Sequence, residues 1–429
     1  MGVRVGYNAG VVEQVLITAA QVIPMGAPAI DDGAVLVEGG VVRAVGARQD
    51  LSREHGGARV HALGDAAVLP GLVNAHTHLE LTLLGPPPGN AQAFVDWVMT
   101  VRTRAAAITD WEHLTRDAVA EGVRQSLACG VTCVGDIANN IHTARAALAA
   151  SPMRGVCFGE VLGMARRTGQ FPHRFSAALD RTFERPGVVA GLEPHAPYSI
   201  DLSLYKKCVE AARKQGLAIC THLAETPDEA EFLAHHSGEL KRLWDYLEAW
   251  DASVTRFAGG PVRAMKEVGL LDVPRGASLA HVNYVDDEEL SILAGGRASV
   301  LYCPRTHAYF GHPEHRFRDM LSAGINVAVG TDSAASSPDL NLLDDLRVIY
   351  RKHADLPPSA IFELATTRAA KALGLDGVVG QIAPGLPADF AVFDARPGDA
   401  LRQILESPAA RPREVWIGGN AMVSSEKAN

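Results

Sequence analysis

The stretch Val68-Leu-Pro-Gly-Leu-Val-Asn-Ala-His-Thr-His-Leu-Glu80 is an apolar run with turn residues that ends in two histidines, His76 and His78, two residues apart. In a strand, residues i and i+2 point to the same side, so both imidazoles face one way. Two neutral imidazoles at a strand end suit zinc or ferrous iron. An isolated pair is also compatible with hydrogen-bonded histidines in a loop, so the rest of the chain has to decide.

From residue 67 onward, the chain alternates apolar strands with helical segments. The first strand is predicted over 67–74, and helical segments follow at 91–107 and 111–129. Seven further strands are predicted at 131–136, 155–160, 187–193, 217–222, 277–281, 298–303 and 325–330. Eight strands, each followed by a helix, over roughly 300 residues are what a (β/α)8 barrel requires. A doubly wound open sheet is disfavoured, because no Gly-x-Gly-x-x-Gly follows the first strand.

The two ends of the chain differ from this region, since they contain short strands separated by glycine-rich turns. We predict that residues 1–66 and 376–429 form one composite β-sandwich domain. Residues 67–375 then form the catalytic barrel of an α/β protein. The stretch 228–252 is charged and partly amphipathic, and it is compatible with a lid, an interface or one long helix.

Composition narrows the class of protein. A chain of 429 residues with 47% hydrophobic residues can bury one large core, and a net charge of −9 argues against nucleic acid or an anionic membrane as partner. No stretch has the length of a membrane span, and the start, Met1–Asn8, lacks a signal-peptide pattern, so a cytoplasmic location is predicted. The six scattered cysteines are predicted to be buried free thiols, with a metal pair of Cys129 and Cys133 as the alternative. The oligomeric state is open, and a homo-oligomer is compatible with the sequence.

Candidate ligands follow several of the predicted barrel strands. His195, His222, His281 and Asp332 lie at or just beyond the ends of strands four, five, six and eight. Active sites of (β/α)8 barrels lie at the C-terminal ends of the strands. Each histidine alone fits a structural, hydrogen-bonded role, but together with the first pair they predict a metal site.

These residues resemble the amidohydrolase superfamily, specifically its branch of cytosine, guanine, S-adenosylhomocysteine and chlorotriazine deaminases and hydrolases. The resemblance covers nearly the whole chain. It rests on PGLVNAHTHLEL, PHAPYSI, HLAET, the lone His281, GTDSAASSPDLNLLDDL and GQIAPGLPADFAVFD. It implies metal-dependent hydrolysis of a small heterocyclic substrate on a (β/α)8 barrel.

The resemblance also implies one divalent ion, zinc or alternatively ferrous iron, with the ligands His76, His78, His222 and Asp332. Three imidazoles and one carboxylate leave room for a water, whose pKa the metal lowers toward neutrality. Binuclear relatives need a bridging ligand, usually a lysine after strand four. This strand ends in Glu193 and His195 instead, so one metal is expected.

Three residues receive catalytic roles by the same resemblance: Glu225, His281 and Asp332. Glu225 is the expected proton shuttle between water and the ring nitrogen or leaving amine, because a partly desolvated carboxyl beside a metal can have an intermediate pKa. Its alternative role is a helix N-cap or a surface acid. His281 and Asp332 are expected to orient or deprotonate the water, and His195 to contact the substrate or, alternatively, to bind the metal.

Four further residues are candidate substrate contacts. Arg305 and His307 follow strand seven, where relatives usually have a Cys-Pro-x-Ser-Asn loop, and they are placed to contact an acidic or hydroxylated substrate. Glu80 is placed to bind a ribose or a ring nitrogen, with a helix cap or a salt bridge as the alternative. Arg166, after strand three, either overhangs the pocket or lies in a solvated loop.

HTHLEL and CPRTHAYFGH are similar to the branch that deaminates 6-amino-6-deoxyfutalosine in menaquinone biosynthesis. This substrate is an adenosine-like nucleoside carrying a benzoate, for which Arg305 or Arg166 is the expected partner. The predicted reaction is the deamination of an adenine-type ring with release of ammonia. The alternatives are hydrolysis of another heterocycle (of the S-adenosylhomocysteine, adenosine, guanine or chlorotriazine type) and a non-catalytic scaffold.

Overall fold

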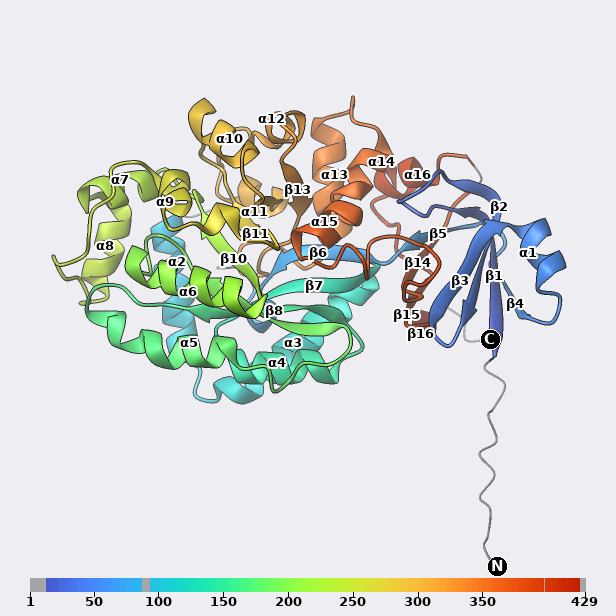
Figure 1. Ribbon diagram of the computed structural model, residues 1–429, viewed down its shortest axis with the longest axis horizontal. Helices are drawn as coiled ribbons and strands as arrows, with labels where there is room; N and C mark the ends of the chain where they lie inside the picture. The colour runs from blue at the N-terminus through green and yellow to red at the C-terminus, as the bar shows by residue number, and fades with distance from the viewer. Residues whose placement is uncertain (1–12, 87–92, 397, 425–429) are drawn as a thin grey trace, which may run out of the picture.

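The computed structural model describes residues 13–86, 93–396 and 398–424. The opening residues Met1–Asn8 and the first two residues of the helix predicted over 91–107 lie outside these ranges. Two eight-stranded sheets organise the chain: a parallel barrel sheet and a separate mixed sheet built from both ends (Figure 1). No helix within the described ranges is long and apolar enough to cross a bilayer.

The barrel sheet has its strands in sequence order, all parallel. They are β6 (Leu72–Thr77), β7 (Val131–Ala138), β8 (Arg154–Val161), β9 (Val188–Pro194), β10 (Ala218–Leu223), β11 (Ala277–His281), β12 (Ser299–Tyr302) and β13 (Asn326–Val329). Nearly all of their residues are buried, as expected for parallel strands covered on both faces. The predicted (β/α)8 barrel is confirmed.

The first and last barrel strands meet where β6 and β13 end. The backbone N–H of Asp332 donates to the carbonyl of His76 at 3.0 Å, and Thr77 forms an isolated bridge with Asp332. A side chain at Gly330 would place its Cβ 2.7 Å from the His76 carbonyl oxygen, so only glycine permits this close approach. The contact brings the histidine pair and the aspartate together.

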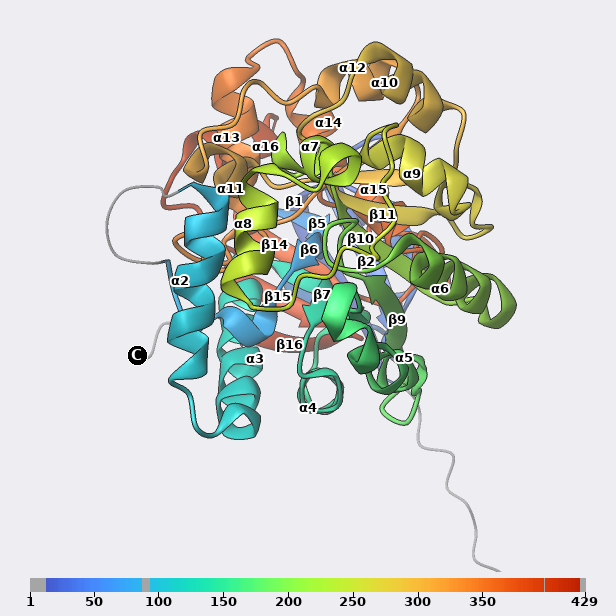
Figure 2. The same ribbon diagram turned by 90° about the vertical axis from the view of Figure 1, so that its left-hand side faces the viewer.

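Helices surround the barrel strands (Figure 2). They are α2 (Phe94–Ala106), α3 (Trp111–Ala128), α4 (Ile141–Ala150), α5 (Phe171–Leu179), α6 (Leu202–Gln215), α7 (Asp228–His235), α8 (Gly238–Tyr246), α9 (Pro261–Glu267), α10 (Asp287–Ala294), α11 (Pro304–Tyr309), α12 (Phe317–Ser322), α13 (Leu342–Lys352), α14 (Pro358–Glu363) and α15 (Thr367–Ala372). The stretch 228–252 is therefore two helices, and the chain breaks between them at His236 and Gly238, which have φ of 53° and 77°. Short 3-10 turns are η1 (Leu79–Leu81), η2 (Ala165–Gln170) and η3 (Leu270–Asp272).

The second sheet joins the two ends of the chain in the order β16-β15-β14-β5-β1-β2-β3, with β4 paired to β1. Its strands are β1 (Gln14–Val22), β2 (Ile30–Glu38), β3 (Val41–Ala47), β4 (Arg59–Ala62), β5 (Ala66–Pro70), β14 (Phe390–Asp394), β15 (Glu414–Ile417) and β16 (Asn420–Ser424). Helix α1 (Arg48–Glu54) connects β3 to β4, and α16 (Ala400–Glu406), between β14 and β15, packs on α13 and α14. The antiparallel pairing of β14 with β5 confirms that the N- and C-terminal segments form one β-structure.

One strand prediction needs correction. The single strand expected over 67–74 is two strands, because β5 pairs in the terminal sheet and β6 begins the barrel. The chain passes between the sheets at Gly71, where a Cβ would lie 2.0 Å from the Thr132 hydroxyl. All six cysteines are free and buried, as predicted.

Candidate active site

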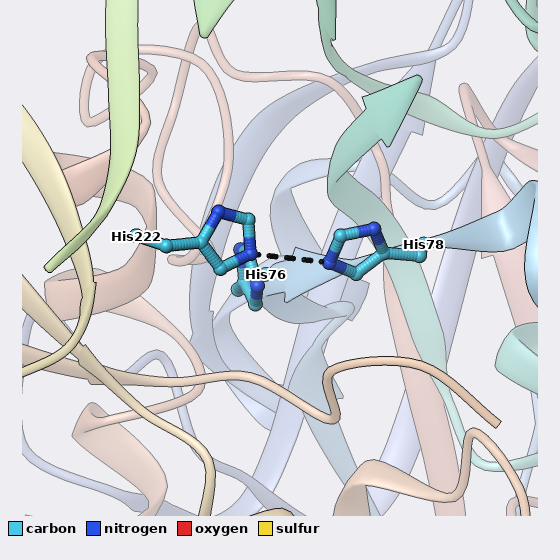
Figure 3. A group of neighbouring side chains, drawn as sticks. All are labelled: His76, His78 and His222. Atoms are coloured by element: carbon cyan, nitrogen blue, oxygen red, sulfur yellow. Dashed lines mark hydrogen bonds between the residues drawn. The ribbon is translucent and has the colours of Figure 1, made fainter. Parts of the chain in front are cut away.

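Three imidazoles converge at the C-terminal ends of β6 and β10 (Figure 3). Each ring contributes one nitrogen, and the three nitrogens, from His76, His78 and His222, lie within 4.8 Å of one another. His78 Nε2 and His222 Nε2 are 3.4 Å apart. Two nitrogens that bind one tetrahedral ion at about 2.1 Å lie about 3.4 Å from each other, so this pair already has ligand spacing.

The carboxylate of Asp332 completes this group. Its Oδ1 lies 3.3 Å from His78 Nε2 and 3.7 Å from His76 Nε2. Both ring nitrogens of His76 are buried without a hydrogen-bond partner in the described part of the chain. Unpaired buried nitrogens are costly unless something binds them. Burial, reinforced by the charge of His222, holds the pKa of His76 and His78 well below the usual range, which favours the neutral form that binds metals.

A buried glutamate, Glu193, to which the sequence assigned no role, orients His222. Glu193 is the penultimate residue of β9, the strand next to β10 in the sheet, and its Oε1 accepts from His222 Nδ1 at 2.8 Å. This bond leaves Nε2 free to face His78. Burial lowers the pKa of His222, but the bond to Glu193 and its charge outweigh burial and raise that pKa to about 10. The sequence does contain a signal for this contact, since Glu193 and His222 lie at the ends of adjacent predicted strands. A carboxylate next to a metal-binding histidine commonly fixes the orientation of its ring.

Glu225 and His281 lie beside the histidine cluster. Both are buried, and Glu225 Oε1 is 3.5 Å from His281 Nε2. Burial, together with the charge of Asp332, raises the pKa of Glu225 to about 8. Glu229, also unnoticed in the sequence, fixes the backbone of this loop by accepting from the Glu225 N–H at 2.6 Å. A carboxyl group with a raised pKa beside such a cluster can exchange protons near neutral pH.

A cavity of about 690 Å³ extends from this cluster beneath α2 and α8. Aromatic side chains form much of its wall: Phe94, Trp97, Tyr198 and Trp244. Its lining includes two arginines, exposed Arg102 on α2 and half-buried Arg167 on η2. Neither has an ion-pair partner among the described residues, and the pKa of Arg167 is lowered by burial and by the charge of Arg102. Two unneutralised guanidinium groups favour an anionic group at this place.

Two of the predicted substrate contacts line this cavity. The His195 ring centroid lies 4.9 Å from that of His222, and its Nδ1 is 2.7 Å from Ser199 Oγ. Glu80 also lines the cavity, but its two oxygens accept the backbone N–H groups of Asn139 and Asn140, each at 2.9 Å. These bonds lie at the start of α4, so Glu80 has the helix-capping role that was its alternative.

The other three predicted contacts do not line the cavity. The guanidinium of Arg305 is occupied by Asp345 at 2.9 Å and Asp339 at 2.6 Å. His307 is buried on α11 against the ring of Tyr302. Arg166 is exposed, and its neighbour Arg167 faces the cavity instead. None of these three side chains lines the cavity in this structure: Arg305 is paired with acidic residues, His307 packs on Tyr302, and Arg166 is exposed.

Fold and site together define a class: a barrel hydrolase with a histidine and carboxylate centre at the C-terminal ends of its strands. The chain belongs to the amidohydrolase family, whose sequence signature matches residues 67–422. Membership in this family, with relatives that carry deaminase names, makes it a hydrolase of carbon–nitrogen bonds.

Two curated relatives and one solved structure illustrate the similarity. The 5-methylthioadenosine/S-adenosylhomocysteine deaminase of Nitratidesulfovibrio vulgaris is 30% identical over 400 residues, covering 89% of this chain and 84% of the relative. The aminodeoxyfutalosine deaminase of Deinococcus radiodurans is 28% identical over 361 residues, 80% of this chain and 81% of the relative. A zinc-bound adenosine deaminase from Xanthomonas campestris shares the fold, with a TM-score of 0.78, 23% identity and coverage of 96% and 93% of the two chains.

Proposed function

We propose that this chain is a metal-dependent aminohydrolase that replaces the exocyclic amine of an adenine-type nucleoside by oxygen and releases ammonia. One observation carries the proposal: a buried carboxyl with a raised pKa, Glu225, lies beside the three-histidine cluster at the inner end of a large cavity. The deaminase names of the two curated relatives support the same reaction.

The ligand set fits one divalent ion. His76, His78 and His222 would each supply one imidazole nitrogen, since these nitrogens lie within 4.8 Å of one another, and Asp332 would supply a carboxylate oxygen. Zinc is the proposed metal, because imidazole and carboxylate are its usual donors and the similar Xanthomonas deaminase binds it; ferrous iron accepts the same set. When bound, the ion would supply Lewis-acid activation of water.

The remaining steps fall to the side chains. Glu225 takes one proton from the attacking water and delivers it to the ring nitrogen. It then takes the second proton from the hydroxyl now bonded to the ring carbon and passes it to the amine, which leaves as ammonia when the carbon–nitrogen bond breaks. His281 Nε2, buried without a hydrogen bond in the described part of the chain, is free to orient that water. His195 borders the heterocycle, since its ring adjoins His222 and lines the cavity.

The two arginines narrow the substrate to nucleosides with an anionic end. Arg102 and Arg167 take the role that the sequence suggested for Arg305 or Arg166. 6-Amino-6-deoxyfutalosine, which carries a benzoate, is the proposed substrate. S-Adenosylhomocysteine is the second candidate, because it also carries a carboxylate and one relative bears its name. Adenosine, guanine and chlorotriazines leave both arginines unpaired.

Ammonia release by the zinc-loaded chain tests the proposal. The panel contains 6-amino-6-deoxyfutalosine, S-adenosylhomocysteine, 5′-methylthioadenosine, adenosine, guanine and a chlorotriazine. We expect the carboxylate-bearing nucleosides to have the highest kcat/KM. Release of chloride alone would refute deamination in favour of the other heterocycle hydrolases. No turnover of any compound at stoichiometric bound zinc would support a non-catalytic scaffold.

A further inference from the structure

Glu160 at the end of β8 presents one unused oxygen to the cavity. Its side chain is 11% exposed and lines the cavity, as His195 does. The other oxygen, Oε2, accepts from Asn139 Nδ2 and lies 3.5 Å from Arg174 Nη1. Oε1 has no hydrogen bond within the described ranges, and His195 Nε2 lies 3.9 Å from it. That distance is too long for a direct hydrogen bond.

The geometry points to Glu160 as a specificity-determining residue that accepts a hydrogen bond from a sugar hydroxyl of the nucleoside. This inference rests on the proposed function. An oxygen placed about 2.8 Å from both Glu160 Oε1 and His195 Nε2 fits the 3.9 Å gap, and the angle between its two bonds is about 90°. A hydroxyl suits this place because it can donate to the carboxylate and also bond the imidazole.

The position of Glu160 along the cavity favours the sugar over the other parts of the substrate. His195 lies between Glu160 and His222, so Glu160 is one side chain removed from the place where the heterocycle reacts. The anionic end of the substrate belongs beside Arg102 and Arg167 rather than beside Glu160, because the Glu160 carboxylate would repel it. In a nucleoside, the group that connects the ring to its 5′ substituent is the sugar.

Glu80 does not compete for this role. Both of its oxygens are already bonded to the backbone N–H groups that begin α4. Glu160 has only one oxygen occupied, so it can accept a ligand hydroxyl without breaking a bond of the protein.

The substitution Glu160→Gln tests this role with little structural change. The glutamine oxygen can still accept from Asn139, while its NH2 replaces the acceptor that faces the cavity. The measurement is kcat/KM for a turned-over nucleoside of the panel and for its 2′-deoxy and 3′-deoxy forms. For the parent nucleoside we expect a loss of about 10- to 150-fold, the range for a hydrogen bond to a charged group. The deoxy form that lacks the bound hydroxyl should change by less than about twofold.

Glu112→Gln is the matched control, because this carboxylate also lines the cavity but is exposed at its rim and 3.9 Å from Arg116. It should leave the ratio between parent and deoxy nucleosides unchanged, and thermal melting of both variants checks the fold. An equal loss on all three nucleosides in Glu160→Gln would overturn the inference.

If the wild-type chain deaminates no nucleoside, the proposed function is refuted, but the role of Glu160 in binding can still be tested. Calorimetric binding of adenosine and its two deoxy forms then decides: a preference for adenosine that Glu160→Gln abolishes supports the role, and no preference refutes it.

Discussion

Glu193→Gln probes the electrostatic support of the metal centre without touching a proposed ligand. Glu193 Oε1 accepts from His222 Nδ1 at 2.8 Å, and the carboxylate is fully buried. A hydrogen bond to a charged group in such a place contributes about 1.5–3 kcal/mol. A tenfold change in an equilibrium constant corresponds to about 1.4 kcal/mol, so the loss of this hydrogen bond should weaken zinc binding about 10- to 150-fold. The physical reason is that a neutral amide polarises the imidazole less than a carboxylate does, which weakens the bond from the ring nitrogen to the metal.

The assay is competition for zinc against a chromophoric chelator at pH 7.5, with kcat measured at saturating zinc. Glu229→Gln is the comparison, since Glu229 is equally buried but holds the backbone of Glu225 rather than a histidine ring. It should lower kcat while its zinc affinity stays near that of the wild type. The reasoning about Glu193 is refuted if Glu193→Gln and wild type bind zinc with the same affinity.

Three further changes test other parts of the site and fold. Glu225→Gln should bind zinc normally yet lose at least about 100-fold in kcat, and unchanged turnover would remove Glu225 from proton transfer. Replacing Arg102 and Arg167 by glutamine should raise KM for carboxylate-bearing nucleosides about 10-fold or more, with adenosine as the uncharged control; equal effects on both would argue against an anion site. Burial raises the pKa of Asp136 from 3.8 to about 8, so the folded state favours the protonated carboxyl. The contribution of this protonation to the free energy of unfolding is lost as pH rises from about 4 through 8. Relative to Asp136→Asn, the wild-type free energy of unfolding in urea should therefore fall by up to about 1.4 kcal/mol per pH unit in that window, whereas parallel pH profiles would contradict the assignment.

The barrel was predictable because its signal is local. Each buried parallel strand is a short apolar run, and the position of a side chain at the end of its strand places it at the active face. That rule placed His76, His78 and His222 at one face, together with three other candidates, and the family resemblance then singled out the ligands. The division of this stretch into two sheets was harder to predict. Pro70 and Gly71 are turn residues, but apolar residues follow on both sides, and only pairing partners far along the chain assign β5 and β6 to different sheets.

The polar contacts were harder to predict, because they depend on partners distant in sequence. Arg305 is neutralised by Asp339 and Asp345, 34 and 40 residues further on. A basic residue after a barrel strand therefore has no fixed role until its acidic neighbours are placed. Arg102 shows the converse, since nothing in its helical surroundings marks it as facing a cavity, and only the packing of α2 over the barrel puts it there.

Backbone strain concentrates at the same strand ends as the chemistry. Ala224, His281, Val282 and Asp332 have φ between 48° and 71°, a region that costs side-chain-bearing residues roughly 1–2 kcal/mol each. Backbone hydrogen bonds hold these turns, including that of Asp332 to the His76 carbonyl at 3.0 Å and that of Val282 to the β10 carbonyl of Leu223 at 2.9 Å. Because each bond runs to a neighbouring barrel strand, the closed barrel itself keeps the turns strained. The side chains at the site are thereby fixed in position before any ligand binds, which is the arrangement that catalysis by prepositioned groups requires.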